Sequence, residues 1–518
     1  MKAESINPAD GSSTGIFPLH EGKEVPRCID SSRIAQKEWA ALSWKARSRA
    51  IGRVGAALVE RADELAALIS RDNGKTKVDA IATEILPAAM ALNYYRSQGK
   101  RILASTRPAG GNILMFNKRS RLHKIPYGVI GVISPWNYPF AIPFSEIIMG
   151  LLAGNGVILK VASDTLAVGQ ALADLFADAG LPEGLFAYVN LPGRLAGPAF
   201  IDGGIDKLFF TGSTAVGKEL MILSAPRLLP LVLELGGNDA AIVRADADLE
   251  RTVSGIIWGG FSNAGQSCGG VQRVFVHESI YLKFCKLLSD RVLKLRVGMP
   301  DEWDTDIGCL TSIKQKEAVE AQIRDCLKKG ARILVQAPLP EGLQSRNFIA
   351  PVVMVDVSED SVLMRDEVFG PVIALVPFAS DEEALMRANN SPYGLTGSVW
   401  SRNRNRAREV ASRMNAGAVT INDHLMSHGL GETPWGGFND SGLGRTHGEQ
   451  GLLEMVRIQV IVDDNLPFAV KAIWWHPYSE KLYLGLRALI RFLYGRNLMR
   501  RLVSLPRVLG IFVRYWER

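Results

Sequence analysis

Between residues 127 and 211 the chain alternates short apolar runs with a segment of helical periodicity, and few folds accommodate that order. Strand-like runs occupy 129–133, 156–161, 186–190 and 207–210, and a helical pattern occupies 166–179. Apolar runs of this length are typical of strands buried on both faces of a parallel sheet. We therefore predict an α/β fold built from βαβ units, with further mixed segments from about 240 to 436.

The size and composition of the chain exclude several classes of protein. The 518 residues suffice for about three domains, and the hydrophobic share of 47% with 22% charged residues is that of a packed globular protein. Five cysteines without a Cys-x-x-Cys pair argue against a disulfide framework and against a metal site. They favour a reducing, cytoplasmic setting.

The positive charge is concentrated at one end of the sequence. Residues 466–518 hold ten Lys/Arg and two acids, a net of +8, so residues 1–465 carry −1 of the total of +7. A neutral body predicts no nucleic-acid partner.

No targeting or membrane-spanning segment is predicted. The first thirteen residues lack the apolar core of a secretory signal. The charge-free run 127–145 is long enough to raise the question of a membrane span, but Pro135, Pro139 and Pro143 interrupt it. Because proline breaks long helices, we interpret this run as a buried strand that leads into a loop.

Two motifs offer a nucleophile and a base. Cys268 ends the sequence Gly-Gln-Ser-Cys, where glycine lets the backbone approach a ligand. Glu234 stands among leucines and glycines, where burial raises the pKa of a carboxyl toward that of a general base. Taken singly, a core cysteine and a turn glutamate explain these two residues at least as well.

Two further motifs offer an oxyanion donor and a phosphate site. Asn137 lies between Pro135 and Pro139, and its amide can donate to a developing oxyanion. Residues 210–217 follow a strand and open a helix, whose N-terminus suits a pyrophosphate. This is not the Gly-x-Gly-x-x-Gly fingerprint, so the motif alone names no dinucleotide.

Read together, the four motifs resemble the NAD(P)-dependent aldehyde dehydrogenase superfamily over most of residues 5–462. Matching motifs also lie at 7–11, 152–155, 366–371, 393–395, 434–438 and 441–445. Residues 422–424 with Gly429 and Glu432 are similar to the branch that includes bacterial dialdehyde and carotenoid-aldehyde dehydrogenases.

The resemblance implies an aldehyde dehydrogenase-like α/β architecture with four parts. A Rossmann-type cofactor-binding domain would occupy 1–236, interrupted at about 105–127 by a small β oligomerisation segment. A catalytic domain would occupy 237–440, and a return and oligomerisation segment 441–465. A basic helical tail would follow at 466–518. The resemblance also implies a homodimer or homotetramer.

The resemblance further implies irreversible oxidation of an aldehyde to a carboxylate. Cys268 would attack as a thiolate, Asn137 with the Cys268 N–H would hold the oxyanion, and Glu234 would activate water to hydrolyse a thioester. Lys160 and Glu367 would hold ribose hydroxyls, and Phe369 would pack beside the nicotinamide. The remaining predicted cofactor-binding residues are Trp136, Ser163, Gly212, Ser213 and Gly217.

One departure from the family pattern concerns the choice of cofactor. Many members carry a glutamate where this chain has Ser163. The missing carboxylate would chelate the adenosine ribose and repel a 2′-phosphate, so we expect this chain to accept NADP as well as NAD.

The predicted substrate is an apolar, bulky or long-chain aldehyde. Gly269 and Gly270 follow the nucleophile, and Tyr138, Ala141 and Ser145 lie at helical spacing where they would face the substrate tunnel. No arginine pair for a substrate carboxylate is evident. A succinate-semialdehyde-type dehydrogenase is the alternative.

The last fifty residues extend past the family pattern. Leu482, Leu486, Leu489 and Leu493 fall at helical spacing, and a second segment, 498–505, is followed by Pro506. A basic amphipathic helix with Trp and Tyr is typical of a peripheral membrane anchor, here at the inner face of the membrane. The alternative is packing on the protein itself or on a neighbouring subunit.

Three rival functions predict different residues. A CoA-acylating relative would generally lack the glutamate at 234. A catalytically silent membrane protein on this fold would have lost Asn137, Glu234, Cys268 or Glu367. A cysteine hydrolase that pairs Cys268 with His277 or His424 leaves the dinucleotide motifs unexplained.

Overall fold

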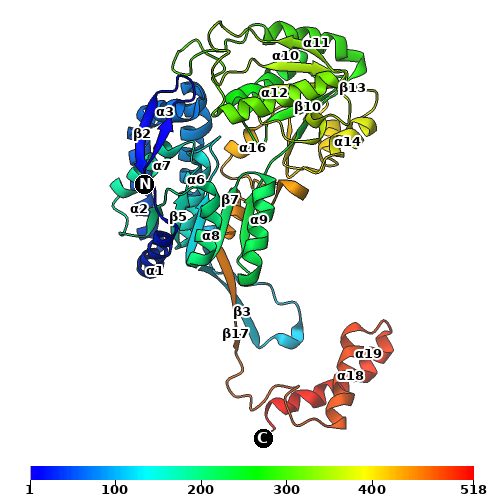
Figure 1. Ribbon diagram of the computed structural model, residues 1–518. Coiled ribbons are helices and arrows are strands. Elements are labelled where there is room, and N and C mark those ends of the chain that lie inside the picture. The colour runs from blue at the N-terminus through cyan, green and yellow to red at the C-terminus, as the bar shows by residue number, and fades with distance from the viewer. Residues whose placement is uncertain (1, 518) are drawn as a thin grey trace. The chain divides into compact units, whose positions relative to one another are not determined.

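The computed structural model describes residues 2–517 and divides them into two compact units. Unit 1 comprises residues up to 104 and 125–457, and unit 2 comprises 105–124 and those from 458 onward. Figure 1 shows the elements of each unit. The predicted α/β fold is confirmed, while the predicted domain limits at 236, 440 and 465 stay predictions.

The first sheet of unit 1 contains six strands, five of them parallel. The order is β16-β8-β7-β4-β5-β6, and only β16 runs antiparallel to its neighbour. Their bounds are Gly442–Leu443 (β16), Leu231–Glu234 (β8), Lys207–Thr211 (β7), Val129–Ile133 (β4), Gly156–Lys160 (β5) and Phe186–Tyr188 (β6). The four predicted strands are all present, within two residues of their predicted ends.

Among the described residues, nine α-helices of the N-terminal half and one helix near residue 450 pack on this sheet or on each other. They are α1 (Val25–Ala41), α2 (Trp44–Glu60), α3 (Ala62–Asn73), α4 (Lys77–Ala80), α5 (Leu86–Leu103), α6 (Ala141–Ala153), α7 (Leu166–Asp178), α8 (Gly193–Gly203), α9 (Thr214–Ser224) and α17 (Gly448–Leu453). The hairpin β1 (Lys2–Ile6) and β2 (Ser13–Pro18) precedes them. The charge-free run 127–145 contains β4, a loop and the first residues of the buried helix α6, where Pro143 is tolerated in the first turn.

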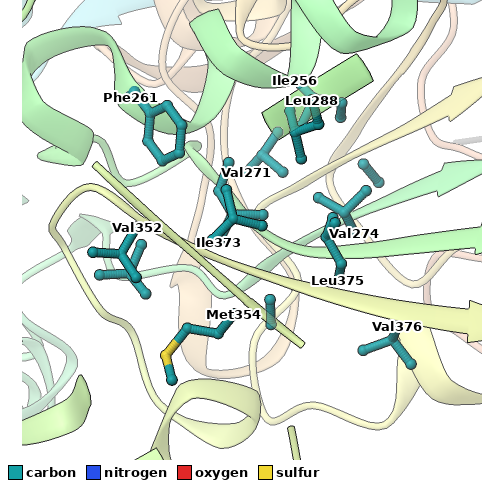
Figure 2. Close-up of a cluster of buried hydrophobic side chains, with 14 of the residues drawn as sticks. Ile256, Phe261, Val271, Val274, Leu288, Val352, Met354, Ile373, Leu375 and Val376 are labelled. Carbon is teal, nitrogen blue, oxygen red and sulfur yellow. The ribbon is translucent and has the colours of Figure 1, made fainter. Parts of the chain in front are cut away.

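The second sheet of unit 1 contains seven strands around the largest apolar core. The order is β11-β12-β13-β10-β9-β14-β15, with β11 antiparallel to an otherwise parallel sheet. The bounds are Arg332–Gln336 (β11), Val352–Val355 (β12), Val372–Phe378 (β13), Val271–His277 (β10), Asp239–Val243 (β9), Thr396–Trp400 (β14) and Ala418–Ile421 (β15). Figure 2 shows Val271, Val274 and Ile373 of this sheet packing in a cluster with helix residues such as Phe261 and Leu288.

Helices also flank the second sheet. They are α10 (Leu249–Phe261), α11 (Glu278–Val292), α12 (Ile313–Lys328), α13 (Val362–Arg365), α14 (Asp381–Asn389), α15 (Arg404–Ala411) and α16 (Met426–Gly429). Strand β10 pairs with β13 on one side and with β9 on the other. The loop that precedes β10 therefore lies at the middle of the sheet. Cys268 belongs to that loop.

Unit 2 combines a two-stranded ribbon with a helical hairpin. The ribbon pairs β3 (Lys118–Pro126) with β17 (Val456–Asp464), and the hairpin consists of α18 (Glu480–Tyr494) and α19 (Leu498–Phe512). A separate core forms around Ile473, Leu482, Leu489, Ile511 and Tyr515. In the described part of the chain no helix is long and apolar enough to cross a membrane.

The helices of unit 2 differ from the sequence prediction in two respects. The helix predicted to stop before Pro506 continues through it to Phe512. The apolar stripe of α18 is covered by α19, since a Cβ on Gly485 would lie 2.0 Å from Ile511 Cγ2. That stripe therefore packs on the second helix of the same tail, and both predicted roles of the tail, membrane docking and packing on the rest of the protein or on a neighbouring subunit, stay predictions.

Candidate functional site

Two cavities of unit 1 meet at Cys268. The first has a volume of about 320 Å³ and is lined by residues of the loop after β4, the turn after β7, the end of β8 and the segment 367–369. The second has a volume of about 280 Å³ and is lined mainly by apolar side chains. Cys268 is the one described residue that lines both cavities, so a group at its sulfur is reached from two sides.

The backbone before Cys268 is held in an uncommon conformation. Asn263 and Ala264 both have φ of +53°, in the left-handed region. At Gly265, with φ of +71°, a Cβ would lie 2.2 Å from the Gly370 carbonyl oxygen, so only glycine fits. The Gln266 side chain accepts a hydrogen bond from the Thr311 N–H at 2.9 Å. These contacts fix the loop that presents the sulfur.

The surroundings of Cys268 keep its thiol protonated. Burial raises the pKa of Cys268, and the carboxyls of Glu367, Asp239 and Glu234 raise it further. Cys268 is predicted to attack as a thiolate, whereas the protein groups around it oppose ionisation of its thiol. A base must therefore accept the thiol proton before the sulfur can attack.

Glu234 and Asn137 line the first cavity together with Cys268. Burial raises the pKa of Glu234 to about 8. One oxygen of this carboxyl receives a long 3.5 Å contact from the Thr446 hydroxyl, and the other has no hydrogen-bond partner among the described residues. Asn137 is buried and its Nδ2 donates to the Gln266 carbonyl at 3.1 Å, which leaves one amide N–H for another acceptor.

Five of the predicted cofactor residues line the same first cavity. Trp136 and Phe369 form an edge-to-face pair with ring centroids 5.2 Å apart. Gly212 and Ser213 form the turn between β7 and α9, where Ser213 is the N-cap. Glu367 accepts from the Gly237 N–H at 3.1 Å, and burial raises the pKa of Glu367 to about 8. All five are lining residues of this cavity.

Three other predicted cofactor residues are not among those that line the first cavity. Gly217 packs inside the fold, since a Cβ there would lie 2.6 Å from Leu235 Cδ2. Lys160 is buried at the end of β5, and burial lowers the pKa of Lys160 to about 8. Ser163 is exposed. Their roles in cofactor binding stay predictions.

The sequence analysis missed Asp164, which is charged and lies next to Ser163 in the chain. The carboxylate of Asp164 counteracts the lowering of the Lys160 pKa, so the two side chains interact electrostatically. A motif comparison confined to position 163 does not consider the carboxylate at position 164.

The second cavity takes its walls from several separate elements. Its lining side chains come from α5 and the segment before it, from the start of α6, from α10, and from the region 425–435: Ala82, Thr83, Leu86, Pro87, Met90, Tyr138, Ile142, Trp258, Ser262, Ser267, Cys268, Leu425, Met426, His428, Gly429 and Trp435. Lys and Arg do not occur among them. The cavity is therefore suited to an apolar group.

The small residues that were predicted to leave room for the substrate are not among those that line this cavity: Gly269, Gly270, Ala141 and Ser145. Gly269 lies against Trp435, where a Cβ would lie 2.9 Å from the ring, so it provides no free volume. Tyr138 lines the cavity as predicted, whereas Ile142 replaces the predicted Ala141 and Ser145. The residues on α5 and α10 gave no local signal, because only the tertiary fold brings them to Cys268.

The two histidines considered as partners of Cys268 are engaged elsewhere. His424 is buried, with one ring nitrogen 2.9 Å from the Ser398 hydroxyl and the other 2.9 Å from the Gly269 carbonyl. Burial lowers the pKa of His424 to about 4. His277 stands at the far end of β10 and caps α11. This arrangement does not favour a cysteine hydrolase.

Comparisons with known proteins agree with this geometry. A profile of the Aldehyde dehydrogenase family matches residues 1–461. A Methylomonas protein named 4,4'-diapolycopene aldehyde oxidase is 35% identical over 495 residues, 96% of this chain and 92% of that protein.

A second relative and a solved structure match over similar lengths. A Mycolicibacterium smegmatis protein with the provisional name succinate-semialdehyde dehydrogenase (NADP+) is 31% identical over 92% of this chain and 93% of that protein. The NAD+ complex of an aldehyde dehydrogenase from Bacillus cereus has a TM-score of 0.84 and 31% identity, and covers 90% of this chain and 93% of that one.

Proposed function

Because the chain belongs to the aldehyde dehydrogenase family, and is therefore an NAD(P)-dependent aldehyde oxidoreductase, we propose that it oxidises apolar aldehydes through Cys268. The observation that carries the proposal is the position of this sulfur between the two cavities. One cavity supplies polar groups and a helix N-terminus, and the other supplies an apolar pocket for the aldehyde chain.

The first cavity fits a dinucleotide. The turn at Gly212 and Ser213 leads into α9, and backbone N–H groups at a helix N-terminus favour a pyrophosphate. At Gly236 a Cβ would lie 2.5 Å from Glu367 Oε2, so glycine keeps this carboxyl accessible for ribose hydroxyls. Trp136 and Phe369 give the groove aromatic walls.

The proposed reaction begins at the sulfur. Glu234 accepts the thiol proton, and Sγ forms a bond to the aldehyde carbon. The oxygen of this thiohemiacetal gains negative charge and accepts hydrogen bonds from Asn137 Nδ2 and the Cys268 N–H. When bound, NAD(P)+ supplies the acceptor for the hydride of that carbon, which leaves a thioester on Cys268.

The second half of the reaction hydrolyses the thioester. After it has released the first proton to solvent, Glu234 removes a proton from water, and the water oxygen attacks the thioester carbon. The S–C bond breaks, the proton held by Glu234 passes to the sulfur and restores the thiol, and the acid leaves as a carboxylate after it releases its own proton to solvent. The presence of Glu234 at the cavity disfavours transfer of the acyl group to CoA.

A panel of aldehydes tests the proposed substrate class. We expect kcat/KM for long-chain and aromatic aldehydes to exceed that for succinate semialdehyde by at least about tenfold, since an uncompensated carboxylate in an apolar pocket costs free energy. A preference for succinate semialdehyde would overturn the proposal.

In the same assays NADP is expected to support turnover within about tenfold of NAD, since position 163 carries no carboxylate, although Asp164 is near.

We also propose that the ribbon of unit 2 is covered by a second copy of the chain. Ile458, Val460, Ile461 and Val462 of β17 are all more than 40% exposed. A two-stranded ribbon with exposed apolar side chains is an unfavourable free surface. A homodimer or homotetramer would bury it.

The exposed side of the helical hairpin supports a further proposal, docking on an anionic membrane surface. Met499, Leu502, Val503 and Leu509 form an exposed apolar stripe on α19, each more than 50% exposed. The net charge of +8 in residues 466–518 complements anionic lipid, with each Lys or Arg near the surface contributing about 1 kcal/mol. The exposed rings of Trp475 and Trp516 suit the interface.

Vesicle flotation tests this docking. We expect the full chain to float with phosphatidylglycerol vesicles and less with phosphatidylcholine vesicles, and the binding to weaken as salt is raised. Replacing Leu502 and Leu509 by glutamate in the full chain is expected to abolish flotation, as is deletion of residues 466–518. Equal partitioning of all proteins would remove the membrane proposal.

A further inference from the structure

A buried lysine outside both cavities holds the loop that carries Asn137. Lys75 follows the end of α3, and its side chain has no exposed surface. Its Nζ donates to Glu84 Oε1 at 2.7 Å and to the Asn137 carbonyl at 2.8 Å. It also lies 4.2 Å from the centre of the Tyr138 ring. Two of the three N–H donors of the ammonium group are therefore hydrogen-bonded, and its charge also faces an aromatic ring.

Glu84 extends this contact to the start of α6. Its second carboxylate oxygen accepts from the N–H of Phe140 at 3.0 Å and from that of Ala141 at 2.8 Å. A carboxylate at a helix N-terminus is favoured by the orphan N–H groups and the helix dipole. The pair Lys75–Glu84 therefore fixes residues 137–141 at both ends.

The residues held in this way include one from each cavity wall. Asn137 lines the first cavity and Tyr138 lines the second. The Asn137 carbonyl also accepts from Asn263 Nδ2 at 3.0 Å, and Asn263 belongs to the loop that precedes Cys268. The carbonyl of Asn137 thus accepts hydrogen bonds both from Lys75 and from the loop that precedes Cys268.

We propose that Lys75 is a positioning residue that sets the place of the Asn137 amide relative to the Cys268 sulfur. This inference rests on the proposed function. Without the ammonium group the Asn137–Tyr138 peptide loses a charged donor, and the side-chain amide shifts from the position where the oxyanion forms. Misplacement of such a group by about 1 Å is enough to lower turnover about 100-fold.

The test compares Lys75→Met with a matched control, Lys207→Met. Lys207 is also buried, forms an ion pair with Glu454 and lies against the Tyr127 ring, but it contacts neither cavity. We expect Lys75→Met to lower kcat about 100-fold, with the Kd of NAD(P) and the KM of the aldehyde changed little. Lys207→Met should lower the melting temperature and leave kcat unchanged.

A double variant, Lys75→Met with Glu84→Gln, separates positioning from folding. It removes the buried charge of Glu84 together with that of Lys75, so the melting temperature should recover relative to Lys75→Met, while kcat stays low. Recovery of kcat in the double variant, or full activity of Lys75→Met, would overturn the inference alone. A wild-type protein inactive on every aldehyde would instead overturn the proposed function.

Discussion

Replacement of Cys268 by alanine is expected to abolish aldehyde oxidation. No other described side chain lines both cavities, so the variant has no group that can form the covalent intermediate. Loss of a covalent nucleophile lowers kcat by at least about 10⁴-fold in comparable enzymes. The measurement is steady-state NAD(P)H formation at saturating aldehyde, together with the Kd of the cofactor, which should not change.

Cys28 provides the matched control for this experiment. It is half-buried, as Cys268 is, and it lines neither cavity. Cys28→Ala should therefore retain full activity and should still be inactivated by an aldehyde-site alkylating agent, whereas Cys268→Ala should not react. Residual activity of Cys268→Ala above about one per cent would exclude the covalent mechanism.

Replacement of Glu234 by glutamine is expected to lower kcat by about 10²–10⁴-fold, the range typical of a lost general base. The wild-type kcat/KM should rise with pH and level off above pH 8, because the pKa of Glu234 is raised to about 8 and only the carboxylate accepts a proton. The variant should show no such rise. An unchanged pH profile in Glu234→Gln would assign the base elsewhere.

The same variant is expected to be more stable than the wild type at alkaline pH. The folded protein retains a proton on Glu234 up to about pH 8, whereas the unfolded chain releases it near the ordinary glutamate pKa of 4.5. The contribution of Glu234 to the free energy of unfolding therefore falls as the pH rises from 4.5 to about 8. The melting temperature of Glu234→Gln should exceed that of the wild type by more at pH 9 than at pH 5.

Glu146 gives the control for Glu234. Its carboxyl is also buried, its pKa is raised by burial and by the nearby Glu234 carboxyl, and it lines neither cavity. Because a glutamine resembles the protonated acid, Glu146→Gln should keep activity within about threefold of wild type. A loss as large as that of Glu234→Gln would show that burial of a carboxyl, and not its place at Cys268, determines the effect.

Much of the fold could be predicted because its strands are buried on both faces. Val129–Ile133 is an uninterrupted apolar run, and such a run has few explanations other than a central strand. Asn137, Glu234 and Cys268 could be found because each lies on a loop or strand end with distinctive neighbours, and the fold brings all three to one cavity.

The walls of the apolar cavity could not be predicted, for a physical reason. Leu86, Met90 and Trp258 lie on the surfaces of α5 and α10, and their local sequence is that of ordinary amphipathic helices. Lys75 was missed because a lysine beside glycine and threonine is typical of an exposed loop. Its burial depends on partners that only the fold brings to it, the carboxyl of Glu84 and the carbonyl of Asn137.

The helical hairpin of unit 2 has a core of its own and lies beyond the residues matched by the family profile. None of the residues of this core lines either cavity, so substitutions made within the core leave the lining of both cavities unchanged.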